Sequence, residues 1–188
     1  NVCSSDLREY ALERGCVREA RRFPSDHSRF EYFRTEGREA DYAAFDDTAC
    51  TLTLMSGLPG SGKDRWIATN AAHLPMVSLD QIRRRTGDIA GAIAVAREEA
   101  RELLRARRSF VWNATNLSRE IRQQTIGLAA SYNARVEIAY TEASAAVLFE
   151  ANRDREYVVP EAAIERMMDR WELPDLTEAH AVGYSLRQ

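Results

Sequence analysis

Gly57-Leu-Pro-Gly-Ser-Gly-Lys-Asp-Arg-Trp66 is the stretch of sequence that decides the fold. It follows a β-rich run at 51–55 and precedes a helix that we expect over 63–73. From Gly57 to Lys63 it has the spacing Gly-x-x-x-x-Gly-Lys, in which glycines let the backbone wrap a phosphate and the next helix presents its positive end. The predicted phosphate-binding residues are Gly57, Pro59, Gly60, Ser61, Gly62, Lys63, Asp64 and Arg65.

Lys63 is the single lysine among the 26 basic residues of the chain. A compact ammonium fits a tight backbone loop that the broad guanidinium of arginine does not fit. The alternative is a glycine turn that carries a lysine by chance. The position of the motif between a strand and a helix favours the phosphate loop.

Asp64 occupies the position where this loop ordinarily has Ser or Thr, whose hydroxyl binds magnesium. A carboxylate repels a polyphosphate unless a divalent cation intervenes, and it is a good oxygen ligand for Mg²⁺. Asp64 is therefore a candidate metal ligand, either directly or through water. The alternative is that it only stabilises the helix N-terminus, which favours a negative residue. The third strand also lacks the usual acid at its end, where Asn113 and Ala114 stand.

From about residue 50, short apolar runs alternate with helical patterns. Strands are expected at 51–55, 75–79, 109–115 and 134–140, with helices at 63–73, from 81, at 91–108, from Ser118 to 131, at 144–152 and from Pro160. Such alternation predicts right-handed parallel units. The expected fold is α/β, with a parallel sheet of about four to five strands, helices on both faces, and a small N-terminal helical segment.

Two regions are expected. Residues 48–188 form the phosphate-loop domain, and residues 1–47 form a helical extension or the tail of an upstream domain missing from this sequence. The net charge of −3 excludes a general basic field for nucleic acids, so such a substrate would need a few local arginines. No apolar run is long enough to span a membrane. Three scattered cysteines predict reduced thiols and a cytoplasmic protein without a cysteine metal site.

Acidic and basic residues follow the strands at the edge where ligands bind in such sheets. Asp80, after the second strand, could accept the proton of an acceptor hydroxyl, and Arg83, on the same helix face, could bind a substrate phosphate. Arg155 precedes Pro160 where a lid would cross the nucleotide, and it could stabilise charge on a transferring phosphoryl group. The alternatives are an N-cap for Asp80, a surface position for Arg83 and a solvated helix end for Arg155.

Several of these motifs together resemble one family. The chain from about 50 to 175 is similar to the polynucleotide 5′-kinase module of phage polynucleotide kinase and bacterial RNA-repair kinases. The resemblance lies in GLPGSGK, in Asp80 to Arg83, in TNL at 115–117 with Arg119 or Arg122 following, and in the lid before VPE at 159–161. It implies that Asp80 is the general base, that Arg83 grips the phosphate next to the acceptor, and that Arg155 belongs to the lid. It also places Thr115 and Asn116 at the substrate and implies an upstream repair domain.

The resemblance implies a P-loop kinase that uses ATP and Mg²⁺, with Lys63, Asp80 and Arg155 as its catalytic residues. Its expected substrate is the 5′-hydroxyl end of a nucleic acid, in RNA repair. Two alternatives stay open at this point. One is a small-molecule kinase on the same fold, and the other is an ATP-binding sensor with little or no turnover, which the unusual Asp64 and Asn113 would suit.

Overall fold

The computed structural model describes residues 4–187, and the chain divides into two compact units, Asn1–Asp46 and Asp47–Gln188. The first unit contains helices α1 (Ser4–Glu13) and α2 (Asp26–Arg34). Ser25 caps α2, because its side-chain oxygen accepts a hydrogen bond from the backbone N–H of Ser28 at 2.9 Å. Phe30 of α2 is buried, whereas Phe33, one turn later, is about half exposed.

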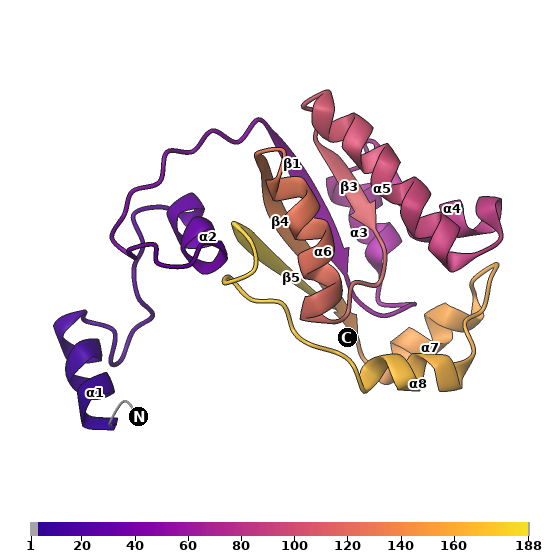
Figure 1. The fold of residues 1–188 in the computed structure, drawn as a ribbon. Helices are drawn as coiled ribbons and strands as arrows, with labels where there is room; N and C mark the ends of the chain where they lie inside the picture. The colour runs from indigo at the N-terminus through magenta and orange to yellow at the C-terminus, as the bar shows by residue number, and fades with distance from the viewer. Residues whose placement is uncertain (1–3, 188) are drawn as a thin grey trace. The chain divides into compact units, whose positions relative to one another are not determined.

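The second unit is built on five parallel strands (Figure 1). They run in the order β2-β3-β1-β4-β5 and comprise β1 (Cys50–Ser56), β2 (Met76–Ser78), β3 (Phe110–Asn113), β4 (Ala134–Ala143) and β5 (Ala181–Arg187). This confirms the expected parallel sheet of four to five strands. The fifth strand, β5, was not among the predicted elements.

Six helices connect and cover the strands. They are α3 (Lys63–Asn70), α4 (Leu79–Thr86), α5 (Ile89–Arg105), α6 (Arg119–Ala130), α7 (Ala145–Arg153) and α8 (Glu161–Met168). Helices α5 and α6 lie on one face of the sheet and α3 on the other (Figure 1). Right-handed crossovers produce this arrangement, because the chain moves outward from β1 to β2 and then returns across the sheet.

One predicted helix start was wrong. The helix after the second strand was expected from residue 81, with an N-cap at Asp80 as the alternative role of that residue, but α4 already begins at Leu79. Its cap is Ser78, whose side chain accepts a hydrogen bond from the N–H of Gln81. Asp80 lies in the first turn, where a carboxylate still interacts favourably with the helix dipole. The predicted cap at Ser118 is confirmed at the start of α6.

Two apolar clusters hold the functional edge of the sheet. The first joins α3 to the sheet through Ile67 and Ala71, which contact Met55, Val111 and Ala139. The second holds α7 and α8 against the phosphate loop through Leu58, Leu117, Leu148 and Ile164. Across residues 4–187, no helix combines the length and apolar character needed to cross a membrane.

Candidate functional site

The loop between β1 and α3 has the backbone shape that its glycines predict. Gly60 and Gly62 have φ values of +84° and +100°, a region that costs residues with a Cβ atom free energy. A Cβ atom on Gly60 would lie 2.5 Å from the carbonyl oxygen of Leu148, so α7 closes against the outside of the loop. A Cβ atom on Gly62 would meet nothing within 4 Å. The loop is therefore packed on one side and open to a ligand on the other.

Lys63, in the first turn of α3, points back into this loop. Its ammonium donates hydrogen bonds to the carbonyl oxygens of Gly57, at 2.8 Å, and of Leu58, at 2.9 Å. Burial lowers the pKa of Lys63 to about 8, because desolvation disfavours the charged form. The nearby carboxylate of Asp64 opposes this effect and the guanidinium of Arg155 adds to it. The two carbonyls thus hold the ammonium in place, but they do not neutralise its positive charge. A bound anion would do so.

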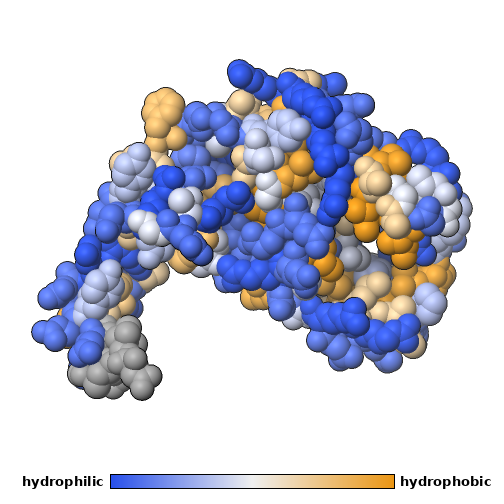
Figure 2. Space-filling model, viewed as in Figure 1, coloured by the Kyte–Doolittle hydropathy of each residue, from blue (hydrophilic) through white to orange (hydrophobic). Residues whose placement is uncertain are grey.

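A cavity of about 170 Å³ lies over the loop. Its walls come from the loop and α3, from α4, from the end of β3, and from α7 with the residues after it. The lining residues are Pro59, Gly60, Gly62, Lys63, Asp64, Arg65, Asp80, Asn113, Ala114, Thr115, Ala151, Arg155 and Arg187. The space-filling view shows a hollow between α4 and the α7–α8 pair, with apolar residues beside it (Figure 2).

Asp80 and Arg155 meet across this cavity. The Oδ2 atom of Asp80 lies 3.7 Å from Nη2 of Arg155, so a carboxylate on α4 faces a guanidinium from the segment after α7. The side chain of Asp80 is 65% exposed and that of Arg155 is 27% exposed. Tyr157 extends the contact, because the guanidinium of Arg84 lies 4.3 Å from its ring centroid. The segment between α7 and α8 therefore contacts α4 at two points.

Four of the predicted site residues do not line the cavity, which was not expected from their motifs. The carbonyl of Gly57 binds Lys63, and its N–H donates to Thr115 at 2.9 Å. Ser61 is buried and its hydroxyl pairs with that of Thr141 at 2.7 Å, on the other side of the loop. Asn116 is also buried and donates to the carbonyl of Met55. Arg83 is exposed on α4, outside the cavity lining.

Two polar residues that were not predicted do line it. Asn113 ends β3, and its side-chain nitrogen donates a hydrogen bond to Oδ1 of Asp64 at 3.0 Å. Arg187 ends β5, which sequence analysis did not detect. Because carboxyl ends of parallel strands share one edge, the polar residue at the end of the third predicted strand was a signal for Asn113. The sequence offered no such signal for Arg187, because β5 was not predicted.

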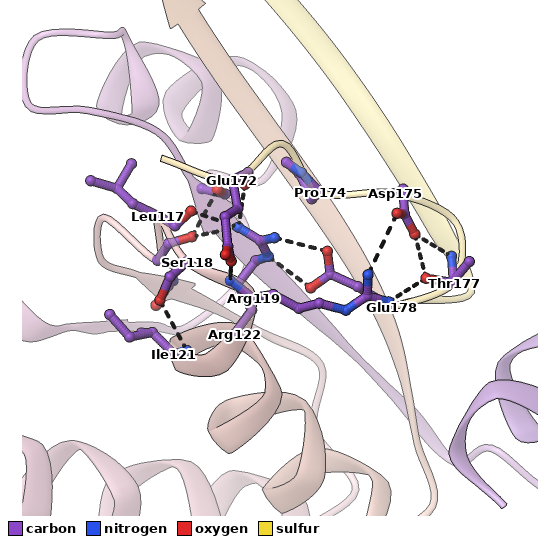
Figure 3. Close-up of polar contacts among 12 residues, drawn as sticks. Leu117, Ser118, Arg119, Ile121, Arg122, Glu172, Pro174, Asp175, Thr177 and Glu178 are labelled. Atoms are coloured by element: carbon purple, nitrogen blue, oxygen red, sulfur yellow. Dashed lines mark hydrogen bonds and ion pairs between the residues drawn. The ribbon is translucent and has the colours of Figure 1, made fainter. Parts of the chain in front are cut away.

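Arg119 and Arg122, which follow the TNL stretch, form structural contacts and do not line the cavity. The guanidinium of Arg122 is fully buried and forms two hydrogen bonds, of 2.9 and 2.8 Å, with the carboxylate of Glu178 (Figure 3). It also donates to the backbone carbonyls of Asn116, Leu117 and Glu172. Arg119 lies beside Asp175 and donates to Thr177. Both arginines hold the C-terminal segment, away from the cavity.

The cavity suits a metal-bound polyphosphate. The open loop N–H groups, Lys63 and Arg155 favour negative charge, whereas Asp64 offers a carboxylate beside them. Mg²⁺ prefers oxygen ligands and keeps several from water and phosphate. Within residues 4–187 no three acidic, histidine or cysteine side chains gather as a metal site. A magnesium ion would therefore depend on Asp64, water and the phosphates together.

Comparison with known proteins identifies the family to which the chain belongs. Residues 52–174 match the model of a family described as AAA domain, AAA_33, which comprises P-loop NTPases. The chain belongs to this AAA domain family. The match covers the loop, Asp80, Asn113 and Arg155, so the residues that line the cavity lie within the matched range, except for Arg187.

Solved structures agree with this AAA domain in fold. The crystal structure of a presumed kinase from Chloroflexus aurantiacus J-10-fl has a TM-score of 0.60 at 18% identity, over 74% of this chain and 86% of that one. A sugar kinase from Janibacter sp. HTCC2649 has a TM-score of 0.55 at 14% identity, over 73% of this chain and 85% of that one. The fold is therefore that of P-loop kinases.

Proposed function

We propose that this AAA domain is an ATP-dependent phosphotransferase whose acceptor is a hydroxyl group, most specifically the 5′-hydroxyl end of a nucleic acid. One observation carries the proposal: Lys63 from α3, Asp80 from α4 and Arg155 from the segment after α7 reach one cavity. A nucleotide-binding loop alone needs only the lysine. The exposed carboxylate opposite an arginine adds what transfer to a hydroxyl requires.

The proposed roles follow from the positions of the side chains. Loop N–H groups and Lys63 bind the phosphates of ATP, which supplies the γ-phosphoryl group. The acceptor oxygen forms a bond to the γ-phosphorus while the bond from that phosphorus to the β–γ bridging oxygen breaks, and ADP leaves. Asp80 takes the proton of the acceptor hydroxyl. Arg155 faces the oxygens on which charge develops, and Mg²⁺ neutralises further phosphate charge when it is bound.

The nucleic-acid acceptor rests on the resemblance in Asp80 to Arg83 and on the position of Arg83. This arginine is exposed one turn after Asp80, where it could bind the phosphate that follows a 5′-terminal nucleoside. A second candidate acceptor is a small sugar or alcohol. It is supported by the kinase folds to which the chain is similar, one of them a sugar kinase, and by the net charge of −3.

The test is transfer of label from γ-labelled ATP to a 5′-hydroxyl oligonucleotide, beside a panel of sugars and small alcohols. We expect the wild type to label the oligonucleotide. Asp80→Asn, which removes the proposed general base, should lower the rate of transfer by at least ~10²-fold. Arg83→Ala should weaken binding of the oligonucleotide but leave a neutral alcohol unaffected. Labelling of a small molecule alone would overturn the nucleic-acid acceptor. ATP binding without transfer to any acceptor would overturn the kinase proposal in favour of a sensor.

A further inference from the structure

Asp64 and Asn113 form a pair that joins the phosphate loop to the sheet. Asp64 lies in the first turn of α3 and Asn113 is the last residue of β3, 49 positions later. The Nδ2 atom of Asn113 donates to Oδ1 of Asp64 at 3.0 Å, and it also lies 3.7 Å from the sulfur of Met76. Asn113 is 8% exposed, whereas Asp64 is exposed in the cavity.

These two residue types are the reverse of the usual arrangement. In P-loop enzymes the loop supplies a Ser or Thr hydroxyl and a neighbouring strand supplies an Asp, and the two together hold magnesium. Here the loop supplies the carboxylate and the strand supplies a neutral hydrogen-bond donor. In both arrangements these two positions together carry one carboxylate and one neutral polar side chain. The two departures from the usual sequence pattern are therefore in direct contact.

We propose that the magnesium-binding carboxylate of this site has moved from the strand to the loop, so that Asp64 binds the metal of Mg·ATP and Asn113 is its positioning residue. The proposal rests on the proposed function only in taking Mg·ATP as the ligand. Asn113 fixes one oxygen of Asp64. Among residues 4–187, the other oxygen, Oδ2, forms no hydrogen bond and is available to a cation.

Electrostatics favours one carboxylate, and not two or none, at this pair of positions. An Asp at position 113 beside Asp64 would place two carboxylates about 3 Å apart, and like charges at that distance cannot both ionise without a high free-energy cost. A Ser at position 64 beside Asn113 would leave no carboxylate at the end of β3 or in the loop. An acid that merely stabilised the N-terminus of α3 would need no partner on β3.

A double-mutant cycle that exchanges the two residue types tests this proposal. It comprises the wild type, Asp64→Ser, Asn113→Asp, and the double variant that restores the usual arrangement. Mn²⁺ affinity in the presence of a non-hydrolysable ATP analogue is measured by electron paramagnetic resonance, and analogue affinity with and without Mg²⁺ by calorimetry. We expect Asp64→Ser to reduce Mn²⁺ affinity by more than about tenfold. The double variant should recover most of that loss, as a non-additive coupling between the two positions.

Asp169→Ser is the matched control, because it removes an exposed carboxylate that follows α8 and does not line the cavity. Circular dichroism and thermal unfolding confirm that each variant is folded. The proposal is overturned if Asp64→Ser binds Mn²⁺ as tightly as the wild type, or if the double variant binds it no better than Asp64→Ser. Because these measurements need no acceptor, a wild type that binds metal through Asp64 but transfers nothing would refute the proposed function alone.

Discussion

At the scale of single residues, the conformation of Lys63 positions a positive charge for phosphate binding. Its ammonium is held by two loop carbonyls, and burial lowers its pKa to about 8. Below pH 8 the group is charged and available to phosphate, and above pH 8 the free protein loses that charge. A bound polyphosphate stabilises the ammonium and raises its pKa again, so binding and protonation are linked.

We therefore predict that the affinity for an ATP analogue falls as the pH rises above about 8, approaching a tenfold loss per pH unit while the bound form keeps its proton. Binding at pH 8.5 to 9 should take up protons. Calorimetry in buffers with different ionisation enthalpies measures this uptake directly.

Lys63→Arg is the control for this pH dependence, because a guanidinium keeps its charge throughout that range. Its overall affinity is expected to fall, but the slope with pH should disappear. An equal slope in the wild type and in Lys63→Arg would assign the titration to a different group.

At the scale of elements, the segment between α7 and α8, residues 154–160, which we call the lid, is held in a defined turn. Asn152 is fully buried, and its amide bonds both backbone groups of Val159, donating to the carbonyl at 2.7 Å and accepting from the N–H at 3.1 Å. This clamp closes the turn that carries Arg155 and Tyr157 to α4. The position of Arg155 therefore depends on a residue that does not line the cavity.

Asn152→Ala is predicted to lower the rate of phosphoryl transfer about tenfold or more while changing ATP affinity little. The N–H and the carbonyl of the half-buried Val159 lose their partner, at a cost of at most about 1–3 kcal/mol each, and the lid loop opens. The measurements are steady-state kinetics, to separate kcat from KM, and limited proteolysis between residues 153 and 158.

Asn70→Ala makes the same truncation at an exposed position, where the side chain binds only the carbonyl of Trp66 in its own helix. It should leave the lid closed to protease. If Asn152→Ala resisted protease as the wild type does, the clamp would not be what holds the lid.

At the scale of the whole molecule, Arg122 and Glu178 join regions of the second unit, Asp47–Gln188, that are distant in sequence. The pair is buried, with side chains 0% and 1% exposed, and Arg122 also binds carbonyls before α6 and in the C-terminal segment (Figure 3). It holds the segment that leads into β5, the edge strand whose last residue, Arg187, lines the cavity. Stability of the domain and completeness of the cavity are thus connected through one arginine.

Arg122→Met is predicted to lower the free energy of unfolding by about 3–5 kcal/mol, because it leaves the carboxylate of Glu178 buried without a partner. Replacing both residues with Met should recover much of that loss, since no buried charge remains. Urea unfolding measures both values.

The exposed pair of Arg101 and Glu98 provides the comparison, and Arg101→Met should cost no more than about 1 kcal/mol. Equal losses for Arg101→Met and Arg122→Met would show that burial of the Arg122 pair has no energetic consequence.

Much of this fold could be read from local patterns, and the failures have physical reasons. Strand β5 was missed because it is an edge strand with mostly exposed residues, so its sequence lacks the apolar run of a buried strand. The start of α4 was misplaced because Ser78 and Asp80 can both cap a helix, and the path of the backbone selects between them. The loop from Gly57 to Lys63 was predictable because its spacing follows directly from how glycines and one lysine surround a phosphate.

The sequence by itself determined the phosphate loop, the parallel α/β architecture and the helix start at Ser118, because each depends on residues that are close together in the chain. Only the tertiary structure decided that Asn113 holds Asp64, that Arg155 faces Asp80, and that Arg122 pairs with Glu178. These partners are 49 to 75 positions apart. They meet because of the order of strands in the sheet and the closure of the lid, which no local periodicity specifies.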